Sequence, residues 1–309
     1  MKLFRRLEFP LRAPTTPLGV EPLIDKHRTG ADYETEWARS FAARWVRVVL
    51  LESVVRPTIR LLADPHRVGI DRLDDLRRDA LDDERDVPVI FAANHHSHVD
   101  TPLLLTSLPE PWRHKVFVGA AADYFFKTRA TSVASALALN AIPIERTKVA
   151  RKSADHAAKL IGDGWSMAIF PEGGRSPDGW GQPFRGGAAY LAIRCAVPVV
   201  PVHLEGTSRI LRKGKKAPTP ARTTVTFGAP MRPDEGEDSR RFAARIERAV
   251  AALADEASTD WYVARRRAHR ADTPSLSGPE ATGWRRQWAL GERGPKGGRI
   301  KPKAWPDLS

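Results

Sequence analysis

A histidine and an aspartate five residues apart could form a proton-transfer pair in this 309-residue chain. His95 follows an apolar, strand-like run at 87–91, and Asp100 precedes a helix-like run that begins at 102. The pair therefore lies in a loop at a strand end, where open α/β sheets build their active sites. A carboxylate bonded to a histidine fixes the tautomer of the ring and stabilises the imidazolium that forms on protonation. His95 and Asp100 are thus candidates for a general base and the residue that orients it.

A second stretch, residues 170–176 with the sequence FPEGGRS, has the composition of a ligand-binding turn. Gly173 and Gly174 let the backbone approach a ligand closely, and the guanidinium of Arg175 offers paired donors that match phosphate oxygens. Glu172 could orient Arg175 or accept a hydrogen bond from a substrate hydroxyl. Taken alone, the stretch could equally be a turn with a surface ion pair.

Two further stretches complete the set. A strand-like run with the sequence AIPIER ends at Arg146, and a proline-bounded run, VPVVP, covers 197–201. In their order along the chain, the four stretches resemble the motifs of the glycerolipid acyltransferases typified by 1-acylglycerol-3-phosphate acyltransferase. The family's motifs are Asn-His-x4-Asp, Ile-x-Ile-(Asp/Glu)-Arg, Phe-Pro-Glu-Gly-Thr-Arg-Ser and Val-Pro-x-x-Pro. The third is matched except at Gly174, where the family has threonine, and the resemblance covers roughly residues 85–230.

The resemblance implies an activity. His95 would remove a proton from an acceptor hydroxyl, Asp100 would orient the ring, and the oxygen would attack the thioester carbonyl of acyl-CoA or acyl carrier protein. An acyl-enzyme, a bound cofactor and a metal are not expected. Lysophosphatidic acid is the first choice of acceptor, with phosphatidic acid as product, while glycerol 3-phosphate or another lysolipid or glycolipid remains open. The glycerol-phosphate part would be bound by Arg146, Glu172, Gly173, Gly174 and Arg175.

Strand-like and helix-like runs alternate through the middle of the chain, which predicts an α/β fold. The resemblance makes this a glycerolipid-acyltransferase-like layered fold, with a mixed central sheet flanked by helices. Strands are expected at 87–92, 115–119, 141–145, 166–170, 198–204 and 223–227. Helices are expected at 102–108, 130–139, 150–162, 187–195 and 238–255. The expected divisions are an irregular segment at 1–32, hydrophobic and basic helices at 33–84, an acyltransferase domain at 85–258 and a basic, tryptophan-rich, flexible arm at 259–309.

The charge of the chain points to an acidic partner. The net charge is +13, and the residues from 261 to the end contribute +7 of it, with eleven Lys and Arg against four Asp and Glu. Phosphorylated substrates and an anionic membrane surface both suit this balance, and nucleic acid less so. No signal peptide is visible, and no run of about 18 uncharged apolar residues could span a bilayer. We expect a peripheral protein at the cytoplasmic face of the plasma membrane.

Two alternatives of other classes stay open. His96, His98 and Asp100 read as His-x-His-x-Asp, which resembles the opening of the metallo-β-lactamase-type zinc hydrolase motif. That motif continues with a further histidine where this chain has Thr101. The second alternative is a non-catalytic module that binds anionic surfaces through its basic residues.

Overall fold

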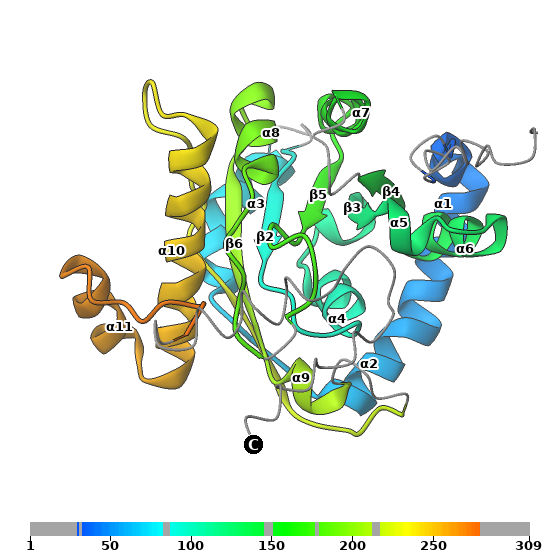
Figure 1. Cartoon of the computed structure of the whole chain (residues 1–309). Helices are drawn as coiled ribbons and strands as arrows, with labels where there is room; N and C mark the ends of the chain where they lie inside the picture. Colours follow the sequence, from blue (N-terminus) through cyan, green and yellow to red (C-terminus); the bar gives the residue numbers. More distant parts are fainter. Residues whose placement is uncertain are drawn as a thin grey trace, which may run out of the picture.

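The computed structural model describes residue 30 and residues 33–82, 87–144, 151–176, 179–211 and 217–278. A seven-stranded sheet forms its centre, in the order β1-β7-β6-β2-β5-β3-β4 (Figure 1). All neighbouring strands pair in parallel except β6 and β7, so the sheet is mixed, as expected. The strands are β1 (Pro65–Val68), β2 (Ile90–Ala93), β3 (Val116–Ala121), β4 (Ala141–Ile144), β5 (Ser166–Ile169), β6 (Val199–Glu205) and β7 (Thr223–Phe227).

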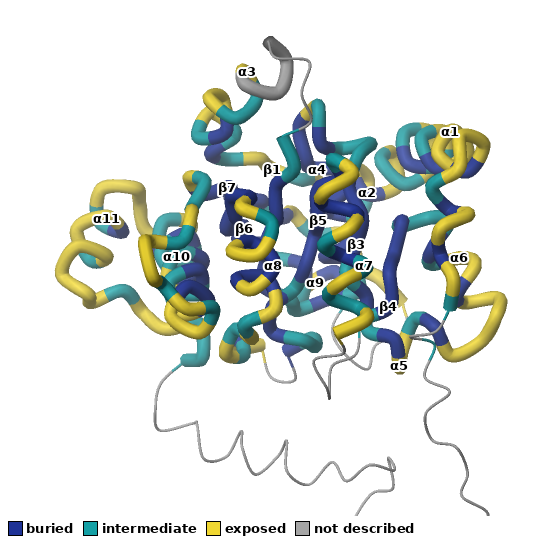
Figure 2. Tube along the Cα trace, turned by 90° about the horizontal axis from the view of Figure 1, so that it is seen from above, coloured by how far each residue is buried: buried dark blue, intermediate teal, exposed yellow. Residues whose placement is uncertain are grey.

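Helices cover both faces of this sheet, because successive strand residues point to opposite sides. In β2, Phe91 and Ala93 belong to one apolar cluster, and Ile90 and Ala92 belong to the other. The first cluster includes residues of α2 (Arg56–Ala63) and α4 (Asp100–Ser107). The second includes residues of α7 (Arg151–Gly162), α8 (Gly187–Cys195) and α10 (Ser239–Ser258). Figure 2 shows the buried strands enclosed between these layers.

The N-terminal helices begin beside the β4 edge of the sheet and continue over one of its faces. A 3-10 turn (Glu36–Arg39) precedes α1 (Phe41–Leu50), which runs through a π-helical turn (Leu51–Val55) into α2. The π-helical turn ends two residues before Pro57, whose missing N–H disturbs the regular hydrogen-bond ladder. Arg47 of α1 is buried and donates to the carbonyls of Ala136 and Leu137, so it ties α1 to α6 (Arg129–Leu139).

Several elements differ from the expectation. The segment expected to be helical at 33–84 also contains β1, which pairs with β7 and forms an edge of the central sheet. It continues through a 3-10 turn (Ile70–Leu73) into α3 (Asp74–Asp82). A short 3-10 turn (Trp112–His114) and the short helices α5 (Ala122–Phe125) and α9 (Thr207–Ile210) were not expected either.

The beginning of the expected C-terminal arm is helical. Residues Trp261–His269 form α11, which packs on α10, and only residues up to 278 are described. Asp260 caps α11, because its side chain accepts a hydrogen bond from the backbone N–H of Val263 at 2.8 Å. No helix in the described residues is both long and apolar enough to cross a membrane.

Candidate active site

The loop after β2 is fixed to the sheet before it reaches the candidate base. The side chain of Asn94 donates to the carbonyl of Leu204 at 2.9 Å and accepts from its N–H at 2.7 Å. This pair of hydrogen bonds continues the pairing of β2 with β6 by one residue after the strand ends. His95 therefore leaves the sheet from a fixed point. Spacing alone did not indicate this role of the motif asparagine.

His95 and Asp100 meet as the sequence predicted. Nδ1 of His95 lies 2.8 Å from Oδ2 of Asp100, whose side chain is fully buried at the start of α4. The same oxygen accepts from the backbone N–H groups of His96 and Ser97, at 2.6 and 2.7 Å. The imidazole also stacks on the ring of Phe170, with centroids 4.2 Å apart. Because Nδ1 is bound to the carboxylate, Nε2 is the ring nitrogen that remains for proton exchange.

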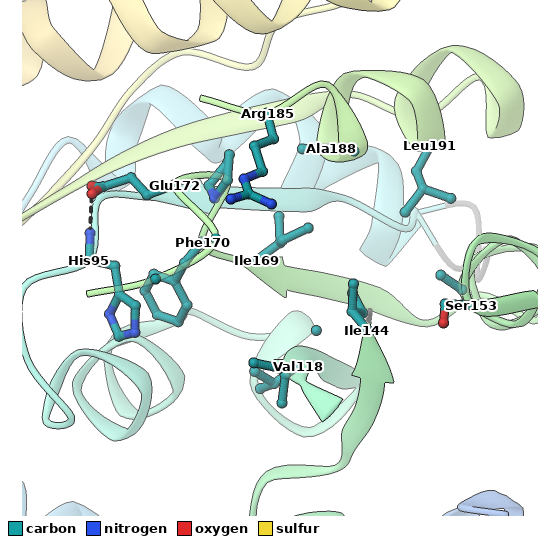
Figure 3. Close-up of a pocket in the computed structure, with 18 of the residues that line it drawn as sticks. His95, Val118, Ile144, Ser153, Ile169, Phe170, Glu172, Arg185, Ala188 and Leu191 are labelled. Carbon is teal, nitrogen blue, oxygen red and sulfur yellow. Dashed lines mark hydrogen bonds between the residues drawn. The ribbon is translucent and has the colours of Figure 1, made fainter. Parts of the chain in front are cut away.

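Glu172 is buried and bonds to two separate backbone segments. Its Oε1 accepts from the N–H of His95 at 2.9 Å, and its Oε2 accepts from the N–H of Gln182 at 2.9 Å. Figure 3 shows Glu172 directed toward His95 with this hydrogen bond drawn. The carboxylate therefore ties the histidine loop to the loop that follows residues 170–176, a geometry that favours support of His95 over direct contact with a substrate hydroxyl.

Two arginines lie at the cavity beside the glycine turn, Arg175 within the turn and Arg185 after it. Gly173 has a positive φ of 71°, and a Cβ atom there would lie 2.8 Å from Nε of Arg185. Arg175 and Arg185 both line the cavity described next, and Figure 3 shows Arg185 directed into it. Arg185 was not among the predicted site residues. Its signal in the sequence is an arginine directly before Gly186 and a second glycine, a combination similar to that of the turn itself.

One end of a cavity of about 800 Å³ is lined by His95, Glu172, Arg175 and Arg185. The cavity extends from His95 across β3, β4 and β5 and is bounded by α7 and α8 (Figure 3). Away from His95 and the arginines its wall is largely apolar, with Val118, Leu139, Ile144, Ile169 and Leu191 among the lining residues. A polar end and an apolar extension in one cavity suit an amphiphilic ligand.

His98 and Tyr124 also line this cavity, near Arg175. The Tyr124 hydroxyl lies 3.0 Å from Nε2 of His98. Burial lowers the pKa of His98, and the charges of Arg175 and His95 lower it further against a smaller opposing effect of Asp100, so the neutral ring is favoured. His98 can therefore exchange hydrogen bonds here without adding a charge.

Two expectations from the sequence remain, namely Arg146 as a site residue and a zinc site in the histidine loop. Arg146 lies outside the described residues. Within the described ranges, no group of three or more His, Cys, Asp and Glu side chains is arranged to hold a metal ion. Oδ2 of Asp100 faces His95 and two backbone N–H groups, and its geometry gives no support to a zinc site with His96 and His98.

Comparisons with known proteins agree with the motifs. Residues 70–205 match the family model described as Acyltransferase. A 1-acyl-sn-glycerol-3-phosphate acyltransferase from Brassica napus, BAT2, chloroplastic, is 31% identical over 134 residues, which cover 42% of this chain and 37% of that protein. The human 1-acyl-sn-glycerol-3-phosphate acyltransferase beta is 28% identical over 149 residues, covering 45% of this chain and 49% of that protein. The chain thus spans less than half the length of these curated relatives.

The fold also has a solved counterpart. The crystal structure of the 1-acyl-sn-glycerophosphate (LPA) acyltransferase PlsC from Thermotoga maritima superposes with a TM-score of 0.53 and 22% sequence identity. The match covers 74% of this chain and 84% of that one. This likeness establishes the layered α/β fold. The family model and the relatives named above match the region of the chain that carries the motifs. Residues 70–205 of this chain therefore match the Acyltransferase family in sequence, within a fold that resembles a solved acyltransferase.

Proposed function

We propose that this chain transfers a fatty acyl group from an acyl thioester to a hydroxyl of lysophosphatidic acid, giving phosphatidic acid. The observation that carries the proposal is the pair of His95 and buried Asp100, 2.8 Å apart, at the polar end of a largely apolar cavity. The relatives' names support the same acceptor. The thioester is a co-substrate, supplied as acyl-CoA or acyl carrier protein.

In the proposed reaction, Nε2 of His95 takes the proton of the acceptor hydroxyl as its oxygen attacks the thioester carbonyl. Asp100 stabilises the imidazolium that forms, because its carboxylate is already bonded to Nδ1. The tetrahedral intermediate then collapses, the C–S bond breaks, and the imidazolium returns the proton to the leaving thiolate. The acyl group passes directly to the acceptor, so no residue of the chain is acylated.

The phosphate of the acceptor would lie against the arginines at the polar end of the cavity. Arg175 and Arg185 line that end, and guanidinium groups match phosphate oxygens in charge and geometry. Arg146 remains a proposed third contact on the strength of its motif. The acyl chain of one substrate would occupy the apolar part, where burial of its methylene groups favours binding.

We further propose a peripheral location on an anionic membrane, at the cytoplasmic face of the plasma membrane. The outer face of α1 and α2 supports this, because Phe41 is 77% exposed, Trp45 57% and Leu61 83%. Exposed aromatic and aliphatic side chains on a basic protein suit the headgroup region of a bilayer. A lysolipid acceptor would reach the enzyme from that surface.

The test measures release of free coenzyme A by the purified protein with acyl-CoA and lysophosphatidic acid. We expect release that requires the acceptor and is lost in His95→Ala, while His66→Ala, an exposed histidine on the edge strand β1, keeps full activity. Release with glycerol 3-phosphate alone would retain the reaction and change the acceptor. Full activity in folded His95→Ala protein would refute the proposed base.

A further inference from the structure

The loop that supports His95 through Glu172 has its own hydrogen-bond partners. The backbone N–H of Gln182 binds Glu172, that of Phe184 binds Glu247 of α10 at 2.9 Å, and that of Arg185 binds the carbonyl of Pro171 at 2.9 Å. Position 183 is proline and has no N–H to satisfy. The partner of the next amide back, at Gly181, lies far away in the sequence.

That partner is the carbonyl of Leu276, 2.8 Å from the N–H of Gly181. Gly181 is buried, and a Cβ atom there would lie 2.9 Å from Cβ of Leu276. Gly278 packs on the ring of Trp180 so closely that a Cβ atom would lie 2.5 Å from it. Residues 272–278, which we call the C-terminal clasp, thus contact two consecutive residues of the loop.

The clasp is held in place at its other end. Arg267 of α11 forms an ion pair of 2.6 Å with Asp255 of α10, whose side chain is 2% exposed. The N–H of Asp272 then donates to the carbonyl of Arg267 at 2.9 Å, which fixes the start of the clasp. Figure 1 shows the chain leaving α11 and crossing α10 toward the centre of the molecule.

A continuous series of hydrogen bonds therefore joins the clasp to the candidate base. Leu276 binds Gly181, the adjacent Gln182 binds Glu172, and Glu172 binds the backbone of His95. The clasp lies outside residues 70–205, the region that the family model matches. This chain thus stabilises a loop of its acyltransferase domain with a segment that follows that domain.

We propose that the C-terminal clasp positions His95 for acyl transfer by holding Gly181 and Trp180, so that Glu172 keeps the histidine loop in its reactive place. The inference rests on the proposed function for its catalytic consequence. Gly181 is buried, so its N–H needs an acceptor, and loss of the Leu276 carbonyl makes the loop open to water or shift. A shift of about 1 Å at a reacting group can lower a rate by about a hundredfold.

The test compares two single substitutions in the full chain. Gly278→Ala places a methyl group into Trp180 at a positive φ of 77°, whereas Gly236→Ala places one at a similar φ of 73° with no atom within 4 Å. The second variant therefore carries the same backbone strain without touching the loop. Gly181→Ala tests the clasp from the loop side, because its methyl group meets Leu276. Gly181 has no positive φ, so this variant adds no backbone strain of that kind.

We expect Gly278→Ala and Gly181→Ala to lower kcat about tenfold or more, with little change in the KM for the thioester. Gly236→Ala should match the wild type in kcat. Backbone hydrogen exchange measured on the same proteins should accelerate at Gly181, Gln182 and His95 in the two clasp variants alone. This readout needs no activity, so it tests the coupling even if the proposed reaction is wrong.

Two results would overturn the inference. One is faster exchange confined to Gly181, with the His95 amide protected as in the wild type. The other is a kcat in both clasp variants equal to that of Gly236→Ala, in an enzyme whose activity depends on His95. Absence of wild-type activity together with coupled exchange would instead reject the proposed function and retain the clasp.

Discussion

At the scale of single residues, the two carboxylates of the site both bind backbone N–H groups. Asp100 accepts from two amides of its own loop in addition to His95, and Glu172 accepts from one amide on each of two loops. The sequence predicted the His95–Asp100 pair, because a spacing of five residues across a loop and helix start is a local property. It did not predict the partners of Glu172, because they depend on how two distant loops meet.

Glu172→Gln tests whether this residue supports the loops or binds the substrate. The amide can keep one acceptor, but its NH₂ group then faces a backbone N–H that it cannot bind. We expect the free energy of unfolding to fall by about 1–3 kcal/mol and kcat to fall with it. Urea unfolding and steady-state kinetics measure the two effects. An increase in the KM for the acceptor alone, with unchanged stability and kcat, would assign Glu172 to substrate binding instead.

At the scale of elements, burial and local pattern decided which predictions succeeded. The six expected strands agree with β2–β7 because each is a short run of apolar or β-branched residues that is bounded by helix or turn signals. The edge strand β1 escaped notice, since its sequence is PHRV, His66 and Arg67 are exposed, and only β7 pairs with it. Helix α11 was hidden by its basic composition, although Asp260 provides an N-cap signal.

Strand β6 also contains a buried histidine that makes stability depend on pH. Burial, with a smaller effect of the charge of His96, lowers the pKa of His203 from 6.5 to about 4. Below pH 6.5 the unfolded chain binds a proton at this residue and the folded chain does not, so stability that is present above pH 6.5 is lost as the pH falls toward 4. The loss amounts to about 3 kcal/mol over that interval.

His203→Gln removes this titration while keeping a side chain of similar length. We expect its free energy of unfolding to decrease less steeply than that of the wild type between pH 6.5 and 4. Urea unfolding at several pH values measures both slopes, and the carboxylates that also titrate there contribute equally to each protein. Parallel curves for the two proteins would show that the histidine does not cause the dependence.

At the scale of the whole molecule, two exposed aromatic and basic surfaces lie at opposite edges of the sheet. One is the outer face of α1 and α2, and the other is α11, where Trp261 and Tyr262 are 56% and 66% exposed (Figures 1 and 2). Charge and composition predicted an anionic partner without saying which edge meets it, because both edges are basic. The apolar content separates them, since α1 and α2 expose aliphatic side chains together with their aromatic ones.

Trp45→Asp and Trp261→Asp distinguish the two edges. Each places a carboxylate where an exposed indole now lies, so they match in size and charge change. If α1 and α2 contact the bilayer, Trp45→Asp should weaken binding to vesicles containing anionic lipid by about tenfold or more, since a buried large apolar side chain contributes about 1.5–3 kcal/mol. Trp261→Asp should leave binding close to that of the wild type. Vesicle co-sedimentation measures both, and the reverse order of effects would place α11 at the membrane instead.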